Sequence, residues 1–213
     1  MSTEKKGRLE VVCGSMFSGK SEELIRRIKR AQLAKQQVVM FKHSLDDRTT
    51  NEFIASHDGN KFEAIPIEHA ATILAVVEKD IDVIGIDEVQ FFPTEIINII
   101  CTLIDNGKRV IAAGLDLDFR GIPFGPMPIL MAIADETTKL KAICMVCGQE
   151  AHLTQRIVNG KPASYDDPLI LVGAQESYQA RCRNCFVIDK HPLLDHVTEG
   201  VTRTMEEIEQ ESV

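Results

Sequence analysis

The sequence has no excess of positive charge. Its 24 Lys and Arg residues are outnumbered by 32 Asp and Glu residues, which gives a formal net charge of −8 at pH 7. Proteins that bind nucleic acids generally need Lys and Arg to neutralise backbone phosphates. Aromatic residues are also scarce, at 5% of the chain with no Trp. We therefore expect no nucleic-acid partner, and any phosphate must bind at a local site.

The sequence also has no long apolar run at its N-terminus. The charged residues 1–8 lead into the apolar segment 9–13, which is too short for the hydrophobic region of a signal peptide or for a membrane span. We therefore predict a cytoplasmic protein without a membrane partner. Internal repeats and low-complexity stretches are absent, and 44% hydrophobic with 26% charged residues is typical of a globular chain.

The first two thirds of the chain alternate between strand and helix patterns. Four short apolar runs have the length of buried strands: residues 9–13, 38–41, 81–86 and 109–113. Helices are predicted between them, at residues 20–35, 68–79 and 93–107. This alternation predicts an α/β fold with a parallel sheet, helices on both faces, and ligands at the carboxyl ends of the strands. We assign residues 1–142 to this domain.

The segment after the first predicted strand matches the phosphate-loop motif G-x-x-x-x-G-K-S/T in full. It consists of Gly14, Ser15, Met16, Phe17, Ser18, Gly19, Lys20 and Ser21. The glycines let backbone amides converge on phosphate oxygens, Lys20 reaches the outer phosphates, and the Ser21 hydroxyl is a ligand for Mg²⁺. Because the motif lies between a predicted strand and a predicted helix, it predicts binding of a nucleoside triphosphate with Mg²⁺.

Two acidic residues end the predicted strand 81–86. Asp87 is placed to hold the Mg²⁺ of a phosphate loop, and Glu88 follows it directly. A carboxylate at the second position is suited to accept a proton from the attacking group. That group is either a water or a substrate hydroxyl, and the pattern alone does not separate the two.

Four of the six cysteines form two Cys-x-x-Cys pairs. They are Cys144, Cys147, Cys182 and Cys185, and 34 residues separate the pairs. Four thiolates can surround Zn²⁺ completely, which predicts a closed, structural zinc site at the base of an inserted loop. The alternative is a redox dithiol, but neither pair follows the strand-then-helix entry of a thioredoxin motif. Cys13 and Cys101 lie in apolar segments and are predicted to fill the core.

Two charged segments have simpler interpretations. The basic run 26–30 is predicted to form the solvated face of the first helix, with a nucleotide or interface role as the alternative. Residues 191–213 contain five Glu and few apolar residues, so we interpret them as an acidic C-terminal tail.

Taken together, these motifs resemble the type II thymidine kinases, the cytosolic and zinc-containing thymidine kinase family. The resemblance rests on the phosphate loop, residues 87–92, residues 114–120 with 123–125, and the two cysteine pairs. It covers residues 8–190 in unbroken order. It implies a P-loop domain of RecA-like architecture, with a small zinc-binding domain at residues 143–190 that carries a lasso loop.

The resemblance implies a specific reaction. These enzymes transfer the γ-phosphate of ATP to the 5′-hydroxyl of thymidine or deoxyuridine, giving dTMP and ADP in nucleotide salvage. Mg²⁺ is required, and Zn²⁺ is structural. The family is usually a homotetramer and is inhibited by its end product, thymidine triphosphate (dTTP).

Roles for individual residues also follow from the resemblance. Glu88 is the general base, while Asp87 and Ser21 serve Mg²⁺. Three further residues belong with the nucleotide: Asp46, Arg48 and Gln90. The thymine pocket is lined by Met16, Leu115, Phe119, Phe124 and Thr154. The lasso that closes over the base includes Leu169, Ile170, Leu171, Val172, Gly173 and Tyr178.

Two other functions fit part of the pattern. A phosphate-loop ATPase that moves on nucleic acid also carries Asp-Glu after a strand, but it needs a basic track that this sequence lacks. A zinc-ribbon adaptor with a vestigial nucleotide site would not need the complete set of Lys20, Ser21, Asp87 and Glu88.

Overall fold

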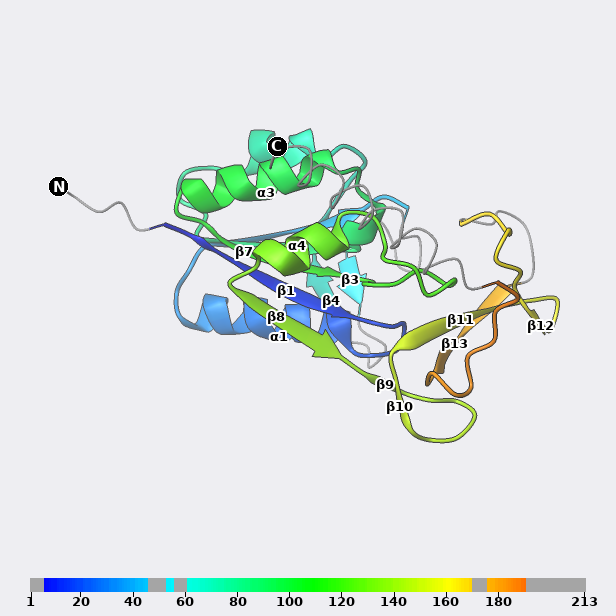
Figure 1. The fold of residues 1–213 in the computed structure, drawn as a ribbon. Helices are drawn as coiled ribbons and strands as arrows, with labels where there is room; N and C mark the ends of the chain where they lie inside the picture. Colours follow the sequence, from blue (N-terminus) through cyan, green and yellow to red (C-terminus); the bar gives the residue numbers. More distant parts are fainter. Residues whose placement is uncertain (1–5, 46–52, 56–60, 170–175, 191–213) are drawn as a thin grey trace, which may run out of the picture.

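A computed structural model describes residues 6–45, 53–55, 61–169 and 176–190. Its centre is a six-stranded sheet in the order β5-β2-β6-β7-β1-β8, in which every pairing is parallel (Figure 1). The strands are β1 (Arg8–Gly14), β2 (Val38–His43), β5 (Ile65–Ile67), β6 (Val83–Asp87), β7 (Arg109–Gly114) and β8 (Glu136–Leu140). The predicted α/β fold class is confirmed.

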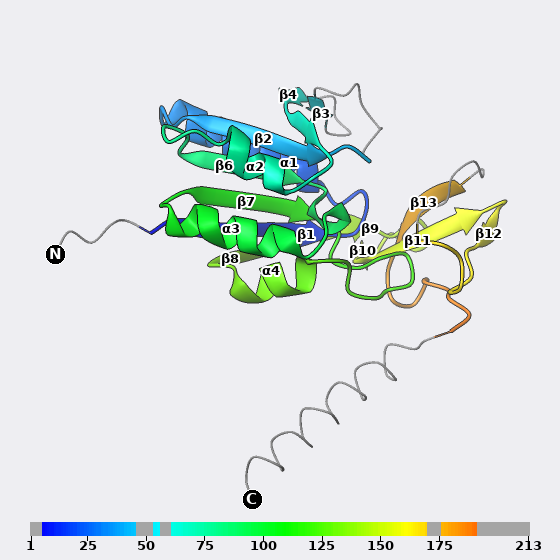
Figure 2. The ribbon, with the colours of Figure 1, turned by 90° about the horizontal axis from the view of Figure 1, so that it is seen from above.

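Helices cover both faces of this sheet. They are α1 (Lys20–Leu33), α2 (Ala71–Val76), α3 (Glu95–Asp105) and α4 (Met127–Ile133), with a 3₁₀ turn, η1 (Val89–Phe91), after β6. Helix α1 lies alone on one face, and α2, α3 and α4 lie on the other (Figures 1 and 2). Among the described residues, none of these helices combines the length and the apolar character that a membrane span requires.

The central strands are largely apolar because both of their faces are covered. Along β1, Leu9, Val11 and Cys13 pack into the core under α3 and α4. Val12 points to the other face and packs under α1. Successive side chains of a strand alternate between the two faces of the sheet. A strand between two helical layers therefore has no face exposed to water, and most of its side chains are apolar.

Two strands of the main sheet have no clear signal in the sequence. Strand β8 reads Glu-Thr-Thr-Lys-Leu and is largely exposed at the edge of the sheet. At the opposite edge, β5 has only three residues and includes Pro66. Edge strands are often short, charged or interrupted by Pro because one side of the strand stays unpaired. The predicted helix 68–79 is also shorter in the structure, where α2 has six residues.

The residues after β8 form small antiparallel sheets instead of extending the parallel one. Strand β9 (Ala142–Ile143) pairs with β10 (Glu150–Ala151), and β11 (Leu153–Val158) lies between β12 (Lys161–Pro162) and β13 (Glu176–Arg181). A separate hairpin joins β3 (Phe53–Ala55) and β4 (Lys61–Glu63). Figure 2 shows β11 and β13 beside the carboxyl end of β1. The predicted acidic tail 191–213 lies outside the described residues.

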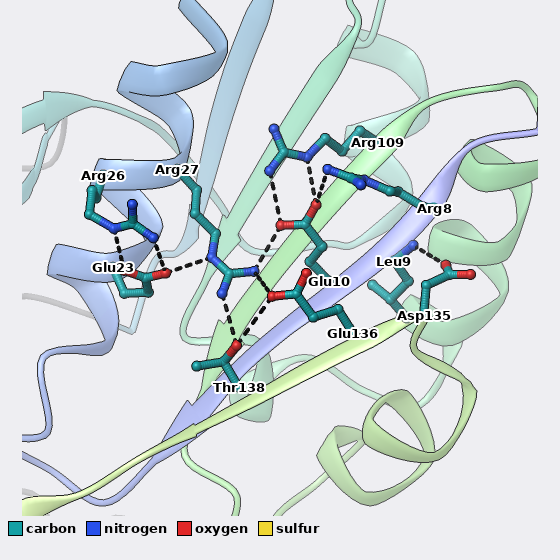
Figure 3. A network of polar contacts seen from close by, with 10 residues as sticks. All are labelled: Arg8, Leu9, Glu10, Glu23, Arg26, Arg27, Arg109, Asp135, Glu136 and Thr138. Atoms are coloured by element: carbon teal, nitrogen blue, oxygen red, sulfur yellow. Dashed lines mark hydrogen bonds and ion pairs between the residues drawn. The ribbon is translucent and has the colours of Figure 1, made fainter.

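A network of ion pairs attaches α1 to the sheet (Figure 3). Its centre is Glu10 of β1, which is only 2% exposed on the face that α1 covers. Glu10 accepts hydrogen bonds from Arg27 of α1 at 2.8 Å and from Arg109 of β7 at 2.7 Å. Arg27 also donates to Glu23 at 2.8 Å. The prediction that residues 26–30 form a solvated face is therefore wrong for Arg27, which is 7% exposed.

This network predicts a loss of stability in acid. Burial by itself raises the pKa of Glu10, but the hydrogen bonds and charges of Arg109, Arg27 and Arg8 together outweigh it, and the pKa is lowered. Hydrogen bonds from Arg26 and Arg27 lower the pKa of Glu23 to about 2. Because both folded-state pKa values lie below the ordinary value of 4.5, the stabilisation is complete above pH 4.5 and is lost as the pH falls towards 2.

We therefore expect Glu23→Gln to destabilise the protein by about 1 kcal/mol at pH 6, and by progressively less as the pH is lowered to 3. Urea denaturation of both proteins at pH 6, 4 and 3 measures this difference. The matched control is Glu22→Gln, which changes a neighbouring carboxylate for which no ion pair is recorded. A difference for Glu23→Gln that stays constant across this range would contradict the prediction.

Candidate active site

The phosphate loop connects the end of β1 to the start of α1. A side chain at Gly14 would meet the backbone oxygen of Leu140 at 2.4 Å, so only glycine fits where the loop leaves the strand. Gly19 precedes α1 in the left-handed conformation, with φ at 83°, and no side chain caps the helix. The N-terminus of α1 thus lies directly at the end of the loop, where the helix dipole and the backbone N–H groups favour an anion, as the motif predicts.

Hydrogen bonds hold the polar side chains of the loop in place. The Lys20 ammonium donates to the backbone oxygen of Ser15 at 2.8 Å, and Ser18 donates to the same oxygen at 2.8 Å. The Ser21 hydroxyl donates to a carboxylate oxygen of Asp87 at 2.9 Å. The two side chains predicted to serve Mg²⁺ thus lie in contact although they come from α1 and β6. A hydroxyl and a carboxylate oxygen are the kinds of ligand that Mg²⁺ prefers.

Glu88 follows Asp87 in an unusual backbone conformation. Its φ is 53°, in the left-handed region that few non-glycine residues adopt, and its side chain is 5% exposed. The other Asp87 carboxylate oxygen accepts the backbone N–H of Glu88 at 2.9 Å, which holds the turn. Such strain in a buried carboxylate is typical of functional sites.

Gln90 connects Glu88 to the loop after β7. Its side-chain amide donates to the Glu88 carboxylate, and its carbonyl oxygen accepts the backbone N–H of Leu115 at 3.0 Å. A side chain at Gly114 would meet that carbonyl oxygen at 2.6 Å, and one at Gly125 would meet the Gln90 backbone oxygen at 2.5 Å. Both glycines are therefore needed where two segments approach closely. Gln90 is predicted from the sequence to lie with the nucleotide, and in the structure its side chain contacts Glu88 and Leu115.

The residues predicted to line a thymine pocket come from three segments. Met16 lies in the phosphate loop, Thr154 lies on β11, and Leu115, Phe119 and Phe124 lie in the loop after β7. The backbone N–H of Met16 donates to the Thr154 hydroxyl at 3.0 Å, which joins the first two segments. Phe124 contacts Phe91 edge to face, with ring centroids 5.8 Å apart, which joins the third segment to η1.

Phe119 has a partner that the sequence did not suggest. The guanidinium of Arg156 lies 4.9 Å from the centroid of the Phe119 ring, and Arg156 is fully buried. The same guanidinium donates to the backbone oxygen of Pro168 at 2.6 Å. Arg156 thus ties the Phe119 ring to the segment that leads into the predicted lasso. Only the three-dimensional pairing reveals this link, because 36 residues separate Phe119 from Arg156.

Parts of the predicted site fall outside the described residues. This applies to Asp46, Arg48, Ile170, Leu171, Val172 and Gly173. Leu169 is 37% exposed at the start of the lasso. Tyr178 lies on β13 and pairs in register with Arg156 of β11.

Lys42 is a buried residue that the sequence analysis missed. It is 0% exposed near the carboxyl end of β2, and it pairs in register with Asp87 of the adjacent β6. Met40, two residues earlier, packs under α1, so strand alternation places Lys42 on the same face as α1. A second buried lysine therefore lies at the carboxyl ends of the strands, beside Asp87. In the sequence, Lys42 resembles an ordinary polar residue after an apolar run.

The four cysteines of the two pairs come together in space. All four sulfur atoms lie within 4.8 Å of one another, and those of Cys147 and Cys182 are 3.5 Å apart. Four thiolates at 2.3 Å from one zinc ion would be about 3.8 Å apart, so the cluster has the spacing of a tetrahedral site. One pair follows β9 and the other follows β13. The cluster therefore suits a zinc ion, as the sequence predicted.

A comparison with models of known protein families identifies a match over most of the chain. The family is described as thymidine kinase, and the match covers residues 7–186. These residues include the phosphate loop, the strand end with Asp87 and Glu88, and all four clustered cysteines.

Proposed function

The chain belongs to the thymidine kinase family, and we propose that it transfers the γ-phosphate of ATP to the 5′-hydroxyl of thymidine or deoxyuridine. The single observation that carries this proposal is the position of Glu88. Its neighbour Asp87 contacts Ser21 of the phosphate loop, while Glu88 itself is held by Gln90 to the loop that supplies Leu115. A carboxylate between the phosphate side and the acceptor side is suited to activate a hydroxyl of the acceptor.

In this proposal the phosphate side is formed by the phosphate loop and the carboxyl end of β6. The amides of the loop and Lys20 hold the phosphates, and Ser21 and Asp87 hold Mg²⁺. When bound, Mg²⁺ neutralises charge on the transferring phosphoryl group. The 2.9 Å contact between Ser21 and Asp87 supports this assignment, because it places the two proposed ligand oxygens side by side. Arg48 and Asp46 complete this side by resemblance.

Glu88 acts as the general base. Its carboxylate accepts the proton of the 5′-hydroxyl as the oxygen attacks the γ-phosphate, and Gln90 fixes its orientation. The turn at Glu88 and the close packing of Gln90 against Gly114 support a rigid, preorganised base.

On the acceptor side, the thymine base lies among Met16, Leu115, Phe119, Phe124 and Thr154. The lasso then closes over the base and excludes water, which would otherwise compete for the phosphoryl group. The link from Arg156 to both Phe119 and Pro168 supports a coupling between the base pocket and the stem of the lasso.

The proposal extends to the organisation of the protein. We assign residues 1–142 to the nucleotide-binding domain, residues 143–190 to a domain stapled by structural Zn²⁺, and residues 191–213 to an acidic tail. The change from one parallel sheet to small antiparallel sheets after β8 supports the first boundary. By resemblance to the family, we also propose a cytoplasmic homotetramer that is inhibited by dTTP.

The test is a transfer assay with γ-labelled ATP, thymidine and Mg²⁺. We expect the label in a nucleoside monophosphate, and we expect its formation to stop when thymidine is omitted. Lys20→Ala should lose transfer, because it removes the cation that holds the outer phosphates. Label that appears only as free phosphate, with or without thymidine, would identify a hydrolase and overturn the proposal.

A further inference from the structure

A cavity lies at the amino ends of the parallel strands, whereas the phosphate loop lies at their carboxyl ends. It has a volume of about 360 Å³, and five of its ten lining residues are arginines: Arg8, Arg26, Arg27, Arg30 and Arg109. Arg8 begins β1, whereas the phosphate loop leaves β1 at Gly14. At 3.3 Å per residue, the two ends of this strand lie about 20 Å apart. The arginine cavity is therefore distinct from the proposed active site.

The arginine cavity carries an excess of positive charge. Its five arginines face Glu10 and Glu136 within the lining, and Glu23 pairs with two of the arginines from outside it. Five cations against three carboxylates leave a local charge of +2, although the whole chain has a charge of −8. Like charges held together in a concave site attract a counter-anion.

The carboxylates of the cavity are already in use. One oxygen of Glu10 forms an ion pair with Arg8 at 2.7 Å and accepts a hydrogen bond from Arg109 at 2.7 Å, and the other accepts hydrogen bonds from Arg27 at 2.8 Å and from Arg109 at 2.9 Å (Figure 3). Three hydrogen bonds and one ion pair on a single carboxylate leave Glu10 little capacity for the remaining N–H groups.

Each guanidinium has five N–H donors, so the arginines keep donors that Glu10 does not use. Arg30 has no ion-pair partner within the part of the chain that the structure describes, and its side chain is exposed at the rim of the cavity. The Arg8 side chain is 55% exposed, and its ion pair with Glu10 involves one guanidinium nitrogen. Guanidinium groups match the oxygens of phosphates with paired hydrogen bonds.

We propose that the arginine cavity binds a small, multiply charged anion of the phosphate class. The anion contacts Arg8 and Arg30 at the rim and is attracted by the unbalanced charge of the interior. Because these residues belong to β1 and to α1, the anion bridges the helix to the sheet. Bound anion therefore stabilises the packing of α1, the helix that begins at the phosphate loop.

Equilibrium dialysis of the full chain with labelled inorganic pyrophosphate tests this site. Lys20→Ala serves as the background, so that the phosphate loop contributes little. We expect this variant to bind one pyrophosphate per chain, and we expect the added changes Arg8→Gln and Arg30→Gln to weaken binding at least tenfold. Neither position is buried, so the fold should persist, which circular dichroism checks. The matched control is Lys29→Gln on α1, outside the cavity, and it should leave the affinity unchanged.

A parallel titration with ADP separates the two sources of such an anion. Binding of ADP as tight as that of pyrophosphate assigns the site to nucleotides, and weaker binding assigns it to free phosphates. The proposal is overturned if the Lys20→Ala protein binds no pyrophosphate. It is also overturned if the two arginine changes weaken binding less than tenfold, or if Lys29→Gln weakens it equally.

Discussion

Glu88→Gln is expected to lower kcat for thymidine phosphorylation about 10²- to 10⁴-fold, the usual contribution of a general base. The substitution keeps the shape of the side chain and removes its ability to accept a proton. Nucleotide binding should be nearly unchanged, because the groups proposed to hold the phosphates are Lys20, Ser21 and the loop amides. Steady-state kinetics with thymidine, together with titration of a fluorescent ATP analogue, measures both quantities.

The matched control for this prediction is Glu88→Asp. Aspartate keeps a proton acceptor but is shorter by one methylene group, so it should retain more activity than glutamine. Equal losses in both variants, accompanied by weaker ATP binding, would indicate that Glu88 supports the structure of the turn. Wild-type turnover in Glu88→Gln would show that another group takes the proton.

Much of the fold was predictable because buried parallel strands are apolar on both faces. The runs at 9–13, 38–41 and 109–113 correspond to β1, β2 and β7, which lie inside the sheet. The edge strand β8 could not be found in this way, because its Glu, Thr and Lys side chains face solvent. Its strand conformation depends on pairing with β1, and pairing is not visible in a local pattern.

The candidate site also contains residues that the sequence could identify and residues that it could not. The phosphate loop and Asp87 with Glu88 carry their chemistry in adjacent residues, so the sequence identified them. Gln90, Lys42 and Arg156 gain their significance from neighbours that are distant in the chain. Arg27 shows the opposite error, because a basic residue on a surface helix is ordinarily solvated. It is buried here because Glu10, an acidic residue within an apolar strand, faces it across the helix–sheet interface.

Loss of the proposed zinc ion is expected to destabilise strongly the unit that contains β9 to β13. Among the described residues, the buried cluster around the cysteines consists of small side chains: Ala142, Cys144, Ala151, Ala180 and Cys182. Because alanine side chains bury little apolar area, this cluster contributes little hydrophobic stabilisation by itself. Binding of zinc to four thiolates can supply the missing free energy. We therefore expect Cys182→Ser to abolish zinc binding and to destabilise this unit by more than about 4 kcal/mol.

The same substitution should also impair catalysis, although the cysteines lie outside the proposed pocket. Cys182 directly follows β13, which pairs with β11, and β11 carries both Thr154 and Arg156. The Thr154 hydroxyl accepts a hydrogen bond from the backbone N–H of Met16. Loss of order in these strands would therefore disturb both the phosphate loop and the base pocket. Elemental analysis should find one zinc per chain in the wild type and in the control Cys101→Ser, and none in Cys182→Ser. Full activity in a zinc-free Cys182→Ser protein would refute the structural role of the metal.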